Sequence, residues 1–312
     1  MSLASFEKYP SIENSYRAKH VKKMVELYPL QNCSFLLTEK IDGANIQLFF
    51  QPQKQMKIGR RNGFLKEEEY DSFFGIQEVL PKYTEAFEII QNYVDSKGVS
   101  IRIYGELFGP GILKRINYGD KKIRFFDCIK ENVFLSPHEF LELLEDLKLQ
   151  HLYVPIVKKV SSLNEALEFD VKDLASAFNS KEMVEGVVIK QYENSFRDWG
   201  LDAPFMLKAK TEKFHEKEKS KNVSLKEKDP VIEKWKGIYA SYYNENRIQN
   251  LFSKEGEISS KKEIGKYINL LKQDVNKDFE KEHPEFSELP IKKQKKIMKP
   301  PSFVGRLFLA HC

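Results

Sequence analysis

Cysteine is scarce in this sequence of 312 residues, and Cys33, Cys128 and Cys312 lie far apart. Three scattered cysteines exclude a disulfide framework and a zinc site, and they suit a reducing compartment. The sequence also has no apolar run long enough to cross a membrane. Its first residues lack the basic and apolar stretches of a signal peptide. We therefore expect an intracellular, cytoplasmic protein without membrane segments, or a nuclear one if the source is eukaryotic.

An excess of one charge is also missing. Lysine and arginine number 51 and aspartate and glutamate 46, so the net charge is only +5. A charge excess this small permits an anionic partner but does not demonstrate one.

The order of hydrophobic patterns predicts an α+β fold with two domains. Residues 11–28, 76–94 and 137–147 have helical spacing, and Ser136 is placed to cap the third helix. Short β-rich runs separated by glycine-containing turns fill most of the sequence from residue 34 to 210. An almost wholly polar stretch precedes Pro230, and helical patterns follow it. We expect a first domain over 1–220, a linker over 221–229 and a helical domain over 230–312.

A possible nucleophile stands at Lys40, between a β-run and a turn that contains Gly43. A lysine at this position is held in a fixed and exposed place, as a covalent nucleophile must be. Taken alone, the pattern more often marks an ordinary hairpin turn.

Further charged motifs follow in order along the chain. Lys208 and Lys210 share one face of a strand, because side chains alternate with a period of two. The other motifs are Arg60-Arg61-Asn62-Gly63, Tyr104-Gly105-Glu106-Leu107-Phe108-Gly109, Phe125-Phe126-Asp127 and Glu185-Gly186-Val187-Val188-Ile189-Lys190.

The ordered set KIDG, RRNG, YGELFG, FFD, EGVVIK and KAK resembles the motifs of the covalent nucleotidyltransferases, which include ligases and capping enzymes. The segments FEKYPSIENSY, YGELFGPGILKRINYGDK and LKAKTEKFHEKEK resemble the phage-type RNA ligase 2 family, to which the kinetoplastid RNA-editing ligases are related. The resemblance covers most of residues 6–220. It implies an ATP-grasp-like adenylation domain with antiparallel sheets flanked by helices, followed by a small all-helical domain.

The resemblance also implies an activity and roles for individual residues. Lys40 would attack the α-phosphate of ATP and carry AMP, with Mg²⁺ or Mn²⁺ as the metal. Cations near Lys40 favour its neutral amine and neutralise phosphate charge. The resemblance implies that Arg61, Lys208 and Lys210 contact the phosphates. It implies that Glu185 binds the metal and that Glu106 binds the ribose or the metal. Phe126 would stack on adenine, and Glu39 and Asn45 would also contact the nucleotide. Asp42 replaces the histidine usual in this family and is a second candidate metal ligand.

Structural alternatives remain for these residues. Lys208 and Lys210 could be exposed strand charges, Glu106 a turn carboxylate and Phe126 a core residue. Asp127 could either tie a strand end or orient a cation. In the tail, one set of residues could contact phosphates or form a solvated surface: Tyr239, Tyr242, Tyr243, Arg247, Lys261, Lys262 and Lys266.

Three functions are compared. The first is a monomeric RNA ligase that joins a 3′-OH to a 5′-phosphate, at nicks in duplex RNA. The second is a small DNA ligase or a GTP-dependent capping enzyme. Those relatives usually carry a β-barrel after the catalytic domain, and the helical tail argues against one. The third is a catalytically inactive nucleic-acid-binding protein.

Overall fold

A computed structural model describes residues 6–28, 30, 32–113, 115–198, 200–214, 230–258, 260–301, 303–309 and 311. The chain forms two compact units, residues 1–213 and 214–312. The expected linker over 221–229 lies outside the described residues.

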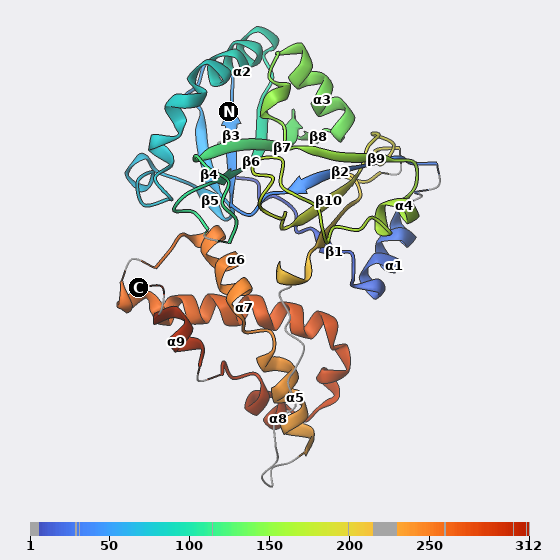
Figure 1. The fold of residues 1–312 in the computed structure, drawn as a ribbon, viewed down its shortest axis with the longest axis vertical. Coiled ribbons are helices and arrows are strands. Elements are labelled where there is room, and N and C mark those ends of the chain that lie inside the picture. The colour runs from blue at the N-terminus through green and yellow to red at the C-terminus, as the bar shows by residue number, and fades with distance from the viewer. Residues whose placement is uncertain are drawn as a thin grey trace. The chain divides into compact units, whose positions relative to one another are not determined.

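The described strands of the first unit form two sheets, whose strands β1 to β10 are labelled in Figure 1. The first sheet has the order β1 (Glu13–Asn14), β11 (Met206–Lys210), β10 (Gly186–Gln191), β2 (Phe35–Lys40) and β9 (Ile156–Val160). Its pairs are antiparallel except β1 with β11. The second sheet is antiparallel, in the order β5 (Gly63–Phe64), β4 (Lys57–Arg60), β3 (Ala44–Phe50), β6 (Ile101–Phe108), β7 (Lys122–Lys130) and β8 (Val133–Phe134). The expected antiparallel sheets are confirmed.

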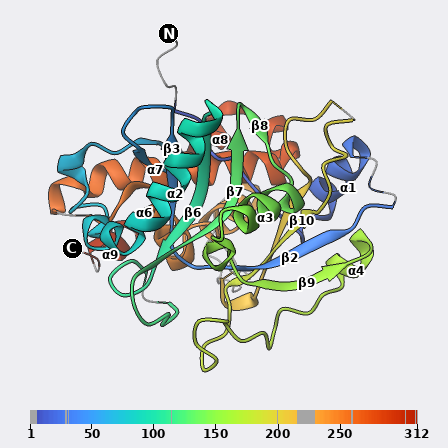
Figure 2. The ribbon, with the colours of Figure 1, turned by 90° about the horizontal axis from the view of Figure 1, so that it is seen from above.

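Helices cover these sheets. The α-helices of the first unit are α1 (Ala18–Leu27), α2 (Thr84–Lys97), α3 (Pro137–Asp146) and α4 (Leu163–Leu167). Helix α2 packs against β3 and α3 against β7, as the second view shows (Figure 2). The predicted cap of α3 is present, because the Ser136 side chain accepts a hydrogen bond from the Glu139 N–H at 3.2 Å. Short 3-10 helices lie at Glu67–Glu69, Ile76–Glu78, Leu80–Tyr83, Gln150–Leu152 and Glu212–Phe214.

Two predicted helices begin later than the hydrophobic spacing indicates. The first begins at Ala18, because the preceding residues add strand β1 to the edge of the first sheet, where the Ser15 N–H donates to the Lys208 carbonyl at 2.9 Å. The second predicted helix, over 76–94, starts with 3-10 turns and becomes α-helical only at Thr84. Pro81 explains this difference, since it has no N–H and restricts the residue before it.

The first sheet has one apolar face and one face rich in lysine. Phe35, Val187 and Leu207 belong to a buried cluster packed on one side of the sheet. Side chains of neighbouring residues point to the opposite side, so the other face carries Lys40, Lys190, Lys208 and Lys210.

The described part of the second unit contains helices and no strand, which confirms the helical prediction. Its α-helices are α5 (Pro230–Ala240), α6 (Glu245–Glu255), α7 (Ile264–Glu282), α8 (Ile291–Ile297) and α9 (Val304–Leu309). None of the described helices is long and apolar enough to span a membrane.

Of the tail residues predicted either to contact phosphates or to form a solvated surface, four do neither. Tyr239, Tyr242 and Tyr243 belong to the buried core of the second unit. The Arg247 guanidinium is also buried, and it pairs with Asp274 at 2.6 Å and with Asp278 at 3.0 Å. These three tyrosines face inward because α5 and α6 pack around α7. The hydrophobic spacing within one helix does not show how several helices pack together.

Candidate active site

Lys40 is the last residue of β2 and stands where the chain crosses from the first sheet to the second. Its Nζ donates a hydrogen bond to Glu185 Oε2 at 2.6 Å. A Cβ at Gly43 would lie 2.4 Å from the Leu107 carbonyl oxygen, so only glycine allows this close crossing. The turn glycine of the motif therefore sets where the lysine stands.

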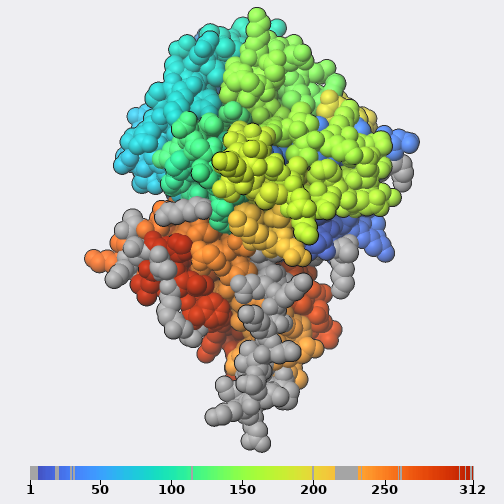
Figure 3. Space-filling model, viewed as in Figure 1, coloured from blue at the N-terminus to red at the C-terminus, as the bar shows by residue number. Residues whose placement is uncertain are grey.

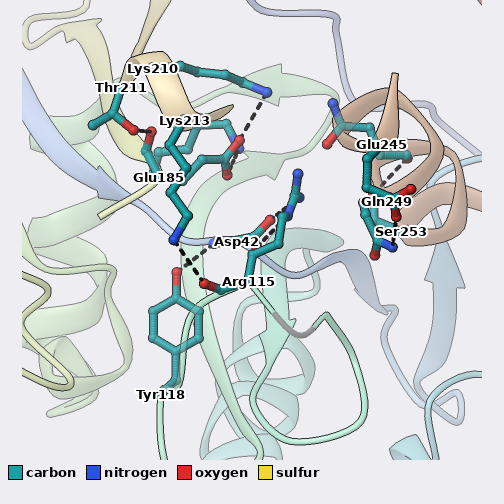
Figure 4. Close-up of polar contacts among 12 residues, drawn as sticks. Asp42, Arg115, Tyr118, Glu185, Lys210, Thr211, Lys213, Glu245, Gln249 and Ser253 are labelled. Carbon is teal, nitrogen blue, oxygen red and sulfur yellow. Dashed lines mark hydrogen bonds and ion pairs between the residues drawn. The ribbon is translucent and has the colours of Figure 1, made fainter. Parts of the chain in front are cut away.

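Two lysines on neighbouring strands form ion pairs with the Glu185 carboxylate. Gly186 is paired in register with Lys40 on one side and with Lys210 on the other. Lys210 Nζ lies 3.0 Å from Glu185 Oε1 (Figure 4). Lys40 Nζ contacts the other carboxylate oxygen, Oε2. Burial by itself would raise the pKa of Glu185, but Lys210 and Lys40 outweigh burial and hold the pKa at about 2. Glu185 is therefore a buried carboxylate that stays ionised.

Lys210 is 7% exposed, which contradicts the alternative of an exposed strand charge at that position. Lys208, two residues earlier on the same face, is partly exposed and is paired in register with Val188 and Asn14.

Asp42 binds an arginine that the sequence motifs did not assign. Arg115 Nε donates to Asp42 Oδ2 at 2.9 Å, and Arg115 Nη2 contacts the other carboxylate oxygen (Figure 4). The Asp42 N–H donates to the Tyr118 hydroxyl at 2.8 Å. Burial, together with Glu185, raises the pKa of Asp42 to about 6, although Arg115 opposes this shift. Arg115 and Tyr118 belong to a segment that carried the family resemblance, which was the available signal for them.

The segment after β6 lies beside the segment before β10. Asn179 Nδ2 donates to the Asn117 carbonyl at 2.9 Å, and the Phe178 and Tyr118 rings are 5.9 Å apart. In the space-filling view these segments, green and yellow-green, meet on one face of the unit (Figure 3). The contact positions the segment that carries Arg115.

Glu106 is the third carboxylate of this region. It lies on β6 and is paired in register with Asn45 of β3. Burial raises the pKa of Glu106 to about 8; Lys40 opposes the shift, and Glu185 and Asp42 add to it. Arg61 also lowers this pKa. The structure thus brings Lys40, Glu185, Asp42 and Arg61 within electrostatic reach of Glu106.

Phe126 lies in a second cluster, with Tyr9, Asp127 and Lys190. Its ring centroid is 5.1 Å from that of Tyr9 and 5.3 Å from Lys190 Nζ. Lys190 Nζ donates to Asp127 Oδ2 at 2.7 Å and to the Phe126 carbonyl at 2.8 Å, and the Tyr9 hydroxyl also donates to Asp127. Asp127 therefore orients a cation, one of the roles left open above. Phe126 keeps a partly exposed ring on a rigid support.

The Glu39 side chain forms hydrogen bonds with a neighbouring loop. Its carboxylate accepts hydrogen bonds from Ser176 Oγ at 2.6 Å and from the Ala177 N–H at 2.9 Å. The Glu39 N–H donates to the Pro155 carbonyl at 2.9 Å, so this backbone donor is already engaged.

The carboxylates suit a magnesium ion that is held largely by phosphates. The described residues contain no group of three or more histidine, cysteine, aspartate or glutamate side chains spaced to hold a metal. Magnesium commonly uses one or two carboxylates together with substrate phosphates and water. Glu185 and Asp42 could serve in this way. Their negative charges, together with burial, raise the pKa of the neighbouring Glu106, so the three carboxylates repel one another. A bound cation would relieve this repulsion.

Comparison with known proteins finds RNA ligase family models that match within both units. A family model described as RNA ligase matches residues 34–210, and one described as T4 RNA ligase 2 C-terminal matches residues 212–300. Two variants of Naegleria gruberi RNA ligase solved with ATP and Mn share the fold at a TM-score of 0.50, with 17% and 18% identity. The match covers 68% of this chain and 58% of those chains. On the family matches, the chain belongs to the RNA ligase family, of the T4 RNA ligase 2 type.

Proposed function

We propose that this protein is an ATP-dependent RNA ligase that forms a covalent lysyl-AMP at Lys40. The observation that carries the proposal is the shared carboxylate of Glu185, which holds Lys40 at 2.6 Å and Lys210 at 3.0 Å. A nucleophile and a phosphate-binding cation are thereby fixed side by side on one sheet face. Related structures were solved with ATP and Mn, which supports the choice of nucleotide and metal.

In the first step, the Lys40 amine attacks the α-phosphate of ATP. A nitrogen–phosphorus bond forms, the bond to the bridging oxygen breaks, and pyrophosphate leaves with the electron pair. Before the attack, the Lys40 ammonium that now donates to Glu185 loses one proton to water. Lys210, Lys208 and Arg61 supply positive charge to the phosphates, and stabilisation of this kind is the main need of phosphoryl transfer.

Magnesium, with manganese as a substitute, would be held by Glu185 and by Asp42, and when bound it would supply further positive charge to the phosphates. The residues of the chain do the positioning. Phe126 offers a ring on which adenine stacks, supported by Tyr9 and Lys190. Asn45 and Glu106 are adjacent on β3 and β6, where they suit contacts with ribose.

The remaining steps move AMP to a 5′-phosphate end and then seal that end to a 3′-OH with release of AMP. We assign these steps to nicked duplex RNA and a monomeric protein, with residues 1–220 as the adenylation domain. The helical domain over 230–312 would hold the duplex. Its α8 presents Lys292, Lys295 and Lys296 as exposed cations, and cations of this kind bind phosphate backbones without reading sequence.

The test is formation of the adduct. The protein is incubated with α-labelled ATP or GTP and a divalent metal and analysed on a denaturing gel. An acid-labile AMP adduct that is absent from Lys40→Ala supports the proposal, and a GMP adduct assigns a capping enzyme. No adduct with either nucleotide refutes both activities. A ligation panel with RNA or DNA on each side of a nick then identifies the polynucleotide.

A further inference from the structure

Two cations of β7 lie over one aromatic ring, outside the cluster of charges around Lys40. Arg124 Cζ is 5.5 Å from the centroid of the Phe178 ring, and Lys122 Nζ is 6.0 Å from it. Both distances are within the range of a cation–π interaction. Alternate residues of a strand point to the same face of the sheet, so Lys122 and Arg124 are neighbours on that face. We refer to Lys122, Arg124 and Phe178 as the β7 surface.

The Phe178 ring is supported from other sides as well. Its centroid is 4.8 Å from that of Phe108 and 5.9 Å from that of Tyr118. The next residue, Asn179, donates a side-chain hydrogen bond to the Asn117 carbonyl at 2.9 Å. The ring therefore has a defined position, while the ring and both cations remain partly exposed.

Neither cation of the β7 surface is paired with a carboxylate of the described residues. Arg124 Nη1 donates to the Ile123 carbonyl at 2.8 Å, and no other hydrogen bond or ion pair joins this guanidinium to a described residue. The Lys122 ammonium lies over the ring and has no hydrogen bond or ion pair within the described part of the chain. Several lysines of the first sheet differ in this respect, because they pair with buried carboxylates. The β7 surface therefore presents positive charge that no ion pair with a described residue offsets.

The β7 surface borders the nucleotide site without belonging to its charge cluster. Arg124 is paired in register with Glu106, which is paired on its other side with Asn45. Laterally paired residues point to the same face of a sheet, so Arg124 follows the two residues that suit contacts with ribose. The cations that act most on the pKa of Glu106 are nevertheless Lys40 and Arg61. The Arg124 guanidinium lies over Phe178 instead, so its charge is available to a ligand beside the nucleotide.

We propose that Lys122 and Arg124 bind neighbouring phosphates of the RNA substrate beside the nucleotide site, and that Phe178 holds the guanidinium in place for this contact. Alternate residues of a strand are about 6.8 Å apart, a separation comparable with that of neighbouring phosphates in a polynucleotide strand. A guanidinium suits a phosphate because its planar fork can donate two hydrogen bonds. This inference rests on the proposed function, in which the substrate is RNA. It adds a contact on the adenylation domain to the contacts assigned to the helical domain.

Binding of the full-length protein to a fluorescent nicked RNA duplex, measured without ATP over a range of salt concentrations, tests the proposal. Lys122→Ala and Arg124→Ala should each lower the slope of log K against log salt concentration by about 0.9, because each loses one phosphate contact. The double variant should raise the Kd about tenfold or more at physiological salt. Phe178→Leu should raise the Kd less, since both cations remain. The KM for ATP in adduct formation should stay that of the parent in all four variants.

The matched control is Lys97→Ala, which removes the same charge from an exposed position. Lys97 ends α2 and precedes β6, whereas Glu106 lies near the end of β6. This variant should keep the Kd and the salt dependence of the parent. Equal melting temperatures would show that each variant is folded.

Several outcomes would overturn the proposal. A Kd and salt slope like those of the parent in the folded double variant would show that the β7 surface does not contact RNA. A raised KM for ATP with normal RNA binding would assign the two cations to the nucleotide instead. An equal loss of binding in Lys97→Ala would show an effect of net charge alone. If the parent forms no adduct, the proposed function fails, and the binding measurement still decides whether this surface holds RNA.

Discussion

Replacing Glu185 with glutamine should destabilise the first unit and abolish adduct formation. The buried carboxylate holds two lysines, and glutamine removes the negative charge that both ammonium groups share. Removing one partner of a buried ion pair costs about 3–5 kcal/mol. A second route gives a similar value, because lowering the pKa of Glu185 from 4.5 to about 2 corresponds to about 3 kcal/mol.

The pKa shift of Glu185 also predicts how the loss of stability in Glu185→Gln changes with pH. The pKa of Glu185 is lower in the folded protein, so its contribution is complete above the unfolded pKa of 4.5 and is lost as pH falls toward 2. The difference in free energy of unfolding between parent and Glu185→Gln should therefore be about 3 kcal/mol at pH 7 and shrink steadily below pH 5.

Urea unfolding followed by circular dichroism, from pH 7 down to pH 3, measures this difference. The matched control is Glu165→Gln, which alters an exposed ion pair with Lys158 at 3.0 Å and should leave stability within experimental error. A Glu185→Gln protein as stable as the parent at pH 7, or a difference that grows in acid, would refute the reasoning about the shared carboxylate.

Three more predictions concern the same site and the tail. Lys208→Ala and Lys210→Ala should each slow adduct formation by at least ~100-fold, the effect typical of losing a group that stabilises a transition state, and near-parent rates in single-turnover assays would contradict this. Arg115→Ala should lower the free energy of unfolding by about 3–5 kcal/mol and raise the pKa of Asp42 further, because it removes the cation that pairs with this buried carboxylate. Unchanged urea unfolding would argue against that pairing. A protein shortened after residue 229 should still form the adduct but seal nicks poorly, as measured by gel ligation and by nick binding against salt; equal sealing would show that the tail does not hold RNA.

Local patterns in the sequence were sufficient for much of the fold. Short β-rich runs between glycine-containing turns located the main strands, and Ser136 marked the start of α3, because these signals depend on neighbours within a few residues. The ordered set of motifs from Lys40 to Lys210, with the segments between them, also identified the family. Hydrophobic spacing failed where Pro81 interrupts a helix and where β1 joins a sheet edge far along the chain.

Tertiary structure decided which charges meet. Lys40 and Glu185 are 145 positions apart, and Arg115 lies 73 positions from Asp42, so no spacing rule links them. The inward turn of Arg247 and the neighbouring tyrosines likewise depends on how the helices of the tail pack. Sequence alone determined the family, the lysine that acts as candidate nucleophile and the order of elements. The pairing of buried charges needed the folded chain, because electrostatic energy depends on distance and burial in three dimensions.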